Sequence, residues 1–154
     1  MDLLDSNHWS DLHVLLGDLD RDIAQLYDEA GLEGVRTRFV GPLIALHRFG
    51  PMTIRALAAK REVSHSAMSQ TAAAMTKAGL VESVPGEDGR TRPIRLTARA
   101  TEIMPFLVAE WRATEAAVRE LDAELPYSLT RVTADLRELL ARRPFALRLR
   151  DHLG

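Results

Sequence analysis

The sequence predicts a mainly α-helical protein with one small β-wing. Apolar residues recur at three- and four-residue steps over most of the chain, which is typical of amphipathic helices. One stretch, residues 80–96, instead has two short runs with strand character around a turn-rich centre. Together, residues 52–96 follow the order helix, tight turn, helix and two-stranded ribbon. That order is typical of a winged helix-turn-helix domain.

The helix-turn-helix is predicted from its caps and breakers. Thr53 can cap a first helix, and the segment at residues 61–63 interrupts it. Ser64 can cap a second helix over residues 64–78, in which Met68, Ala72 and Met75 form one apolar stripe. The side away from that stripe is polar and is the candidate reader of a DNA groove. Its candidate DNA-contacting residues are Ser64, His65, Ser66, Ser69, Gln70 and Lys77.

These side chains differ in what they can recognise. The Gln70 amide can pair bidentately with adenine, so it is the best candidate for direct base contact. The serines and His65 can contact bases or phosphates with less discrimination. The alternative for His65, equally well supported, is a solvent-exposed residue beside the helix cap with no contact to DNA.

The ribbon follows Gly79, which supplies the backbone freedom to leave the helix. Residues 80–84 have the pattern of a short strand, residues 85–89 are dense in turn formers, and residues 90–96 return. The return segment carries three further candidate DNA-binding residues, Arg90, Arg92 and Arg95. The ribbon is narrow enough to lie along a duplex, with its cationic tip near a phosphate or a minor groove.

These motifs resemble the MarR family of bacterial transcriptional regulators. The resemblance rests on LAAKREVSHSAMSQTAAAMTKAGLVE at residues 57–82, the triplet Asp88-Gly89-Arg90, and the pair Leu96-Thr97 at the start of the next helix. It implies a homodimer that binds a pseudo-palindromic operator, with Arg90 in the minor groove. The chain departs from many members by having Ala100 in place of Gly, and by having no Arg or Lys in the second helix before Lys77.

The flanking segments predict further helices. Stripes of apolar residues predict helices over residues 9–30, 37–47, the region after residue 97, and 129–142, with a short terminal helix at 145–152. Pro42 suggests that the second of these starts near Gly41 or bends, and Pro105 is expected to bend or offset the first turns of the helix after the wing. We therefore predict a DNA-binding domain at residues 36–96 and a dimerisation region at residues 1–35 and 97–154. The alternative is a monomer with a helical satellite.

Composition and charge fit this interpretation. With 154 residues, of which 46% are hydrophobic, the chain can bury one core. Residues 50–97 carry seven Lys and Arg against four acids, whereas the remainder carries thirteen against eighteen. A basic helix-turn-helix segment in an otherwise acidic chain is expected of a protein that binds DNA with little non-specific affinity. The alternative is an ordinary pattern of solvated surface charges. The acidic N-terminus and the lack of long apolar runs predict a cytoplasmic protein.

Other functions find little support in the sequence. It has no Gly-rich phosphate loop, no Gly-x-Ser-x-Gly and no Cys, and its five His are scattered, so we expect neither an enzyme nor a metal site nor a cofactor. A pocket for a small aromatic effector could be lined by Tyr27, Phe39, His47 and Trp111. Packing in the protein core is the simpler explanation for aromatic residues. The functional hypothesis is a dimeric repressor. The alternative is a winged-helix protein-interaction module without operator binding.

Overall fold

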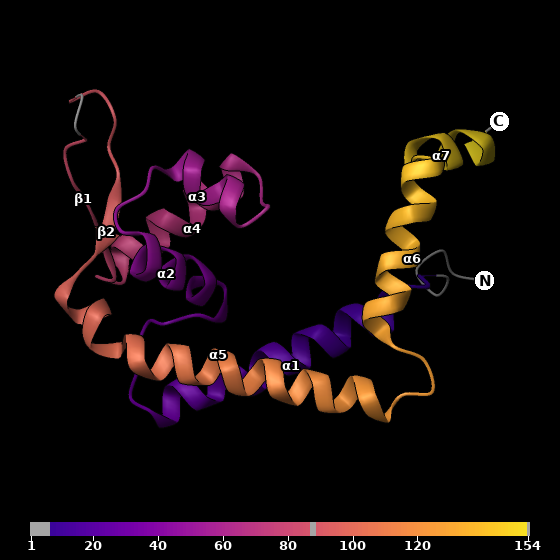
Figure 1. Ribbon diagram of the computed structural model, residues 1–154, viewed down its shortest axis with the longest axis horizontal. Helices are drawn as coiled ribbons and strands as arrows, with labels where there is room; N and C mark the ends of the chain where they lie inside the picture. Colours follow the sequence, from indigo (N-terminus) through magenta and orange to yellow (C-terminus); the bar gives the residue numbers. More distant parts are fainter. Residues whose placement is uncertain (1–6, 87–88, 154) are drawn as a thin grey trace. The chain divides into compact units, whose positions relative to one another are not determined.

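The computed structural model describes residues 7–86 and 89–153. These residues form a mainly helical structure with a small antiparallel sheet, so the predicted fold class is confirmed (Figure 1). The elements follow in the order α1 (Ser10–Glu29), α2 (Thr37–Phe49), α3 (Ile54–Lys60), α4 (His65–Lys77), β1 (Val81–Ser83), β2 (Ile94–Leu96), α5 (Ala98–Glu124), α6 (Leu129–Arg142) and α7 (Phe145–Leu153). No helix in the described ranges is long and apolar enough to cross a membrane.

The chain divides into two compact units, Met1–Val108 and Ala109–Gly154. The first holds α1 to α4, the β-hairpin and the first turns of α5. The second holds the rest of α5 together with α6 and α7. The division that the sequence predicts, residues 36–96 against 1–35 and 97–154, concerns function and stays a prediction.

Two capped helices form the helix-turn-helix as predicted. The Thr53 hydroxyl accepts a hydrogen bond from the Ala56 amide at 3.2 Å, and the Ser64 hydroxyl accepts one from the Ala67 amide at 3.1 Å. Each cap satisfies an amide that has no partner inside its own helix. Between the helices Glu62 adopts a φ of 52°, a left-handed conformation that turns the chain sharply. The two caps therefore set where α3 and α4 begin.

Helix α2 begins at Thr37 and contains Pro42, so a start near Gly41 is wrong. Proline normally disfavours the helical conformation of the residue before it, because its ring crowds that residue's Cβ. Gly41 has no Cβ, which removes this clash. The same absence makes room for the Arg61 guanidinium, whose Nη2 would lie 2.5 Å from a Cβ at residue 41. Gly41 thus allows both an internal proline and a close contact with the turn before α4.

The core of the first unit lies among α2, α3, α4 and the hairpin. Helix α2 contributes most of its length, and α4 contributes Met68, Ala72 and Met75. Leu80 and Val81 from the first arm of the hairpin and Ile94 from the second are also buried. Side chains from the first turns of α5 complete the core: Ala100, Met104 and Leu107. This burial anchors one face of α4 and the base of the hairpin on the same apolar cluster.

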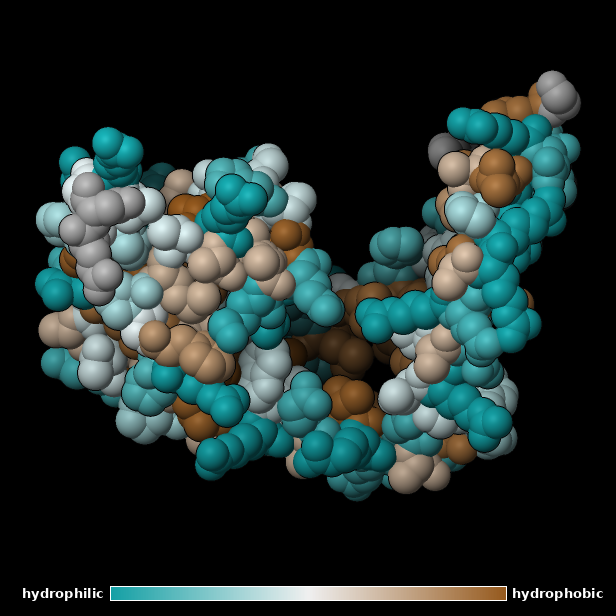
Figure 2. All heavy atoms as spheres, turned by 45° about the horizontal axis from the view of Figure 1, so that its top comes forward, coloured by the Kyte–Doolittle hydropathy of each residue, from teal (hydrophilic) through white to brown (hydrophobic). Residues whose placement is uncertain are grey.

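Helices α6 and α7 contain no buried residue. Figure 2 shows hydrophobic residues interrupting the hydrophilic surface of this part of the chain. The exposed apolar side chains of these two helices are Leu129, Val132, Leu136, Leu139, Leu140, Phe145, Leu147, Leu149 and Leu153. Helix α1 of the first unit likewise exposes Val14, Leu15, Leu16 and Leu26. Exposed apolar side chains that recur along a helix in this way are typical of protein interfaces.

The turn between α5 and α6 is organised by the carboxylate of Asp122. It accepts hydrogen bonds from the Ser128 hydroxyl at 2.7 Å and from the Leu129 amide at 2.6 Å. The Ser128 hydroxyl in turn caps α6 by accepting from the Arg131 amide at 3.2 Å. The Ser128 hydrogen bond, followed by that from Leu129, lowers the pKa of Asp122 below its ordinary value. The ionised carboxylate is therefore the form that stabilises the turn.

We expect acid to weaken this turn. Because the pKa of Asp122 is lowered in the folded chain, its contribution to stability is present above the ordinary aspartate pKa and is lost as the pH falls through the lowered value. Asp122→Asn should lower the melting temperature, measured by circular dichroism, more at pH 7 than at pH 3. The exposed Asp135 of α6 offers a control, and Asp135→Asn should show no such pH dependence. An equal loss at both pH values for Asp122→Asn would exclude this role of the charge.

Candidate nucleic-acid interface

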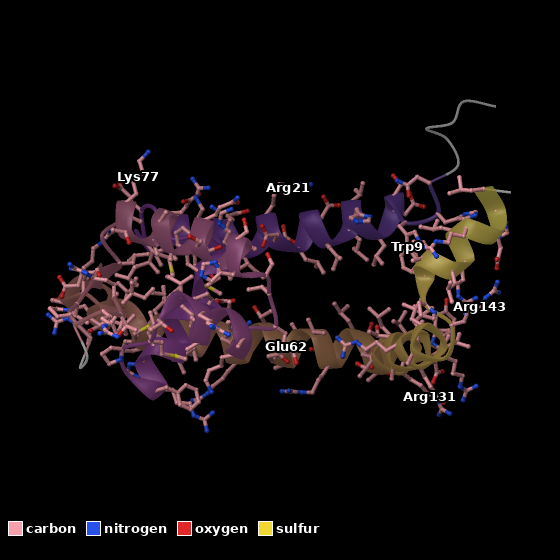
Figure 3. All side chains as sticks on the ribbon, turned by 90° about the horizontal axis from the view of Figure 1, so that it is seen from above. Trp9, Arg21, Glu62, Lys77, Arg131 and Arg143 are labelled. Atoms are coloured by element: carbon pink, nitrogen blue, oxygen red, sulfur yellow. The ribbon has the colours of Figure 1, made fainter. Side chains whose placement is uncertain are left out.

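Helix α4 has one anchored face and one exposed face. Met68, Ala72 and Met75 are buried in the core. The opposite side exposes every candidate DNA-contacting residue that the sequence predicts on this helix: His65, Ser66, Ser69, Gln70 and Lys77, together with the cap Ser64. Figure 3 shows Lys77 projecting away from the domain at the end of α4. The helix thus presents small hydroxyls, one amide and one imidazole to solvent, with a single cation at its end.

Ser64 has a structural role that limits what else it can do. Its oxygen already accepts the Ala67 amide, but a hydroxyl also carries one donor hydrogen. That hydrogen can point to a phosphate oxygen without loss of the cap. Ser64 can therefore both fix the start of α4 and contact a backbone phosphate.

The wing, residues 81–96, is an antiparallel hairpin whose base is tied to the rest of the domain. Its strands pair Val81 with Leu96, Glu82 with Arg95 and Ser83 with Ile94. At the base, the segment between α2 and α3 adds a bridge, in which Met52 and Ile94 exchange both backbone hydrogen bonds, at 3.0 and 2.8 Å. The wing is therefore held at its base by the chain that leads into α3.

Beyond the strands, two further backbone hydrogen bonds extend the wing towards its tip. The Val84 amide donates to the Pro93 carbonyl at 2.8 Å, and the Gly86 amide donates to the Thr91 carbonyl at 3.0 Å. A Cβ at residue 86 would lie 2.9 Å from the Thr91 carbonyl oxygen, so the two arms meet closely only because this residue is glycine. The two arms are thereby held close together at residues 86 and 91.

The three wing arginines have different surroundings. Arg95 pairs across the strands with Glu82, its Nε lying 2.8 Å from the Glu82 Oε1, so it supports the hairpin. Arg90 and Arg92 lie beyond the strands and are exposed. Asp88, an acid close enough in the sequence to pair with Arg90, lies outside the described residues. Arg90 and Arg92 are therefore the wing cations best placed for DNA, with Arg95 nearer the base.

The candidate effector residues lie in different environments. Tyr27 and Phe39 are both 1% exposed, and the Tyr27 ring packs edge-on against Phe106 with 6.4 Å between ring centroids. His47 is exposed in the last turn of α2, and Trp111 is half-buried in the second unit. Packing in the core accounts for Tyr27 and Phe39.

Sequence reasoning missed one group of contacts at the end of α4. Thr97 opens α5 as its motif suggests, and its hydroxyl donates to the Gly79 carbonyl at 2.7 Å. Arg99, on the first turn of α5, donates to the carbonyls of Ala78 and Glu33. These partners lie 21 and 66 residues away in the sequence, so no local pattern could have revealed them.

The geometry defines a winged helix-turn-helix, with α3 and α4 as the helix pair and the β1–β2 hairpin as the wing. Residues 43–91 match the model of the MarR family. This segment runs from α2 through α4 into the wing, so the winged helix of this chain is similar to that of the MarR family, and the predicted resemblance is confirmed. A comparison with curated protein sequences found no match.

Solved structures share this fold over most of their length. The chain is similar to the M. tuberculosis transcriptional regulator MOSR in complex with DNA, at 22% identity and a TM-score of 0.62, covering 87% of this chain and 93% of that one. It is also similar to S. aureus MepR in a DNA complex, at 12% identity and a TM-score of 0.64, covering 90% and 97%. A MarR protein from Peptoclostridium difficile matches at 16% identity and a TM-score of 0.60, covering 92% and 90%. At these identities the likeness establishes the fold.

Proposed function

We propose that this chain is a DNA-binding transcriptional regulator, and not an enzyme, that acts in the cytoplasm as a homodimeric repressor on a pseudo-palindromic operator. The observation that carries the proposal is the pairing of one exposed polar face on α4 with an arginine-bearing wing on the same core. Two structures of similar fold are complexes with DNA, which supports the same reading. Occupying an operator would block access to the promoter.

Specificity in this proposal depends on few base contacts. The Gln70 amide can pair with adenine in the major groove, and the neighbouring hydroxyls and His65 can add weaker contacts. Helix α4 has no Arg or Lys before Lys77, so the common arginine-guanine contact is not available to its first turns. Arg90 would instead sense the width of the minor groove, where negative potential is focused. Recognition would therefore depend strongly on DNA shape.

We propose that a second copy of the chain buries the exposed apolar side chains of α1, α6 and α7 in a dimer interface. Helix α1 carries six acids and one Arg, whereas α6 and α7 together carry five Arg and three acids. Apolar stripes with opposite charge suit one another across a two-fold interface, where each surface meets its counterpart in the partner. A dimer would also present two copies of α4 to successive turns of a duplex.

The alternative function is a winged helix that binds a partner protein without an operator. Its exposed face would then be a docking surface, and the arginines of the wing would have no phosphates to neutralise. Selection of bound duplexes from a random pool, followed by a gel-shift titration, separates the two. Enrichment of a pseudo-palindrome supports the regulator. No enrichment over a scrambled duplex supports the protein-interaction module.

The first variant to test on the selected operator is Arg90→Ala. We expect it to lose about 1–3 kcal/mol of binding free energy, as for other specific nucleic-acid contacts, with no change in melting temperature. Arg119→Ala, on the exposed surface of α5, removes the same charge at a site remote in sequence from the wing and should leave affinity unchanged. Equal affinity of Arg90→Ala and the wild type at matched salt would remove the wing from the mechanism.

Half-site spacing tests the dimer. On B-DNA, two recognition helices of a rigid dimer reach one face when their half-sites lie about one helical turn apart. Inserting roughly five base pairs, about half a turn, should therefore abolish tight binding, while an insertion of about ten base pairs should be less damaging. Sedimentation should give a dimer mass for the free protein. A monomer that binds the expanded operator as tightly as the original would contradict this architecture.

Release by a small aromatic ligand is the last part of the proposal. A ligand changes operator binding only if it prefers one dimer conformation over another. Titrating phenols and aromatic acids should quench Trp fluorescence and release the operator at the same concentrations. Quenching without release would point to binding unrelated to regulation. Absence of both signals across the panel would favour control by the abundance of the protein.

A further inference from the structure

The end of α4 is held by the start of α5. At this end Gly79 adopts a φ of 68°, and the Leu80 amide donates back to the Met75 carbonyl at 3.0 Å. The next carbonyls then point away from the helix and need other donors. Thr97 supplies two of these donors: its hydroxyl binds the Gly79 carbonyl at 2.7 Å, and its amide binds the Leu80 carbonyl at 3.1 Å.

Arg99 supplies a further donor and extends the junction to a third segment. One Nη donates to the Ala78 carbonyl, and the other donates to the Glu33 carbonyl at 2.6 Å. Glu33 lies in the connection between α1 and α2. That connection passes close to α4, since a Cβ at Gly34 would lie 3.7 Å from the Ala78 Cβ. One side chain thus joins the end of α4, the start of α5 and the α1–α2 connection.

The chemistry of Arg99 suits this position. A cation is favourable at a helix C-terminus, where the carbonyl dipoles concentrate negative potential. Hydrogen bonds from a charged donor are stronger than those between neutral groups. The planar guanidinium can also direct two N–H groups to two separate oxygens, whereas a lysine ammonium acts as a single point charge. Lysine would therefore keep the charge but hold the junction less rigidly.

We propose that Arg99 is a positioning residue for operator recognition. It fixes the C-terminal end of α4 to the first turn of α5, the helix on which the predicted dimerisation region begins, and so sets the angle at which α4 enters the groove. The inference rests on the proposed function of α4 as the DNA-contacting helix. Arg99 itself need not touch DNA, so its loss should reduce discrimination between sequences while leaving phosphate contacts in place.

The test compares Arg99→Lys, which keeps the charge, with Arg99→Gln and with Arg119→Ala as a control for loss of an exposed cation on the same helix. Each variant is titrated against the selected operator and against a scrambled duplex over a range of salt. We expect Arg99→Lys to bind the operator about tenfold more weakly, the effect of one hydrogen bond from a charged group. Its affinity for the scrambled duplex and its salt dependence should match the wild type, since the number of phosphate contacts is unchanged.

Two further readouts separate positioning from general stability. Changing the half-site spacing by one base pair should penalise the wild type more than Arg99→Lys, because a looser junction tolerates the change. Without DNA, hydrogen exchange at Gly79 and Leu80 should be about tenfold faster in both Arg99 variants, as expected for the loss of a charged hydrogen bond. Melting temperatures should stay close to that of the Arg119→Ala control.

The outcomes distinguish the inference from the proposed function. If the wild type selects an operator but Arg99→Lys keeps its full specificity and spacing dependence, the positioning role is overturned while the regulator stands. If the wild type selects no operator, the proposed function fails and this role in recognition fails with it. In that case faster hydrogen exchange in the Arg99 variants would still show that Arg99 stabilises the end of α4. Unchanged exchange would contradict that stabilising role as well.

Discussion

The structure of the candidate interface depends on the burial of one face of α4. Met68, Ala72 and Met75 are held in the core by α2, α3 and the base of the hairpin. Because a helix repeats every 3.6 residues, fixing this stripe also fixes which side chains face outward. The hydroxyls, Gln70 and His65 are exposed as a consequence. The polar surface that we propose contacts DNA is thus oriented by apolar contacts on the other side of the same helix.

The wing is tied to the same core, so the two surfaces that we propose contact DNA share one anchor. Val81 and Ile94 are buried on the inner side of the hairpin, and Met52 bridges to Ile94 beside the start of α3. The position of the wing relative to α4 therefore follows from shared packing within one unit. Arg95 stabilises the hairpin through Glu82, while Arg90 and Arg92 lie beyond the strands. Exposed ion pairs contribute little stability, so the backbone hydrogen bonds and the buried base carry most of the wing.

The remaining helices have a different character. Their stripes are apolar but exposed, and their charges are unequal, with acids along α1 and arginines along α6 and α7. Within the second unit, local contacts such as the Asp122 carboxylate and the Ser128 cap define the helices without burying their apolar residues. A second copy of the chain offers both apolar surface and opposite charge. Stability and DNA recognition would then be coupled, because both would need the dimer.

The sequence by itself determined the elements and the class of the fold. Thr53 and Ser64 cap α3 and α4, and the break at residues 61–63 ends α3. The break Arg142-Arg143-Pro144 ends α6. Each of these signals acts through neighbours within one helical turn. Only the tertiary structure decided that α2 continues through Pro42, because this part of α2 is buried in the core and packing there offsets the hydrogen bond that proline cannot donate. It also decided that Arg95 pairs with Glu82 and that Arg99 joins three segments. Those contacts link residues 13 to 66 positions apart, which local periodicity cannot encode.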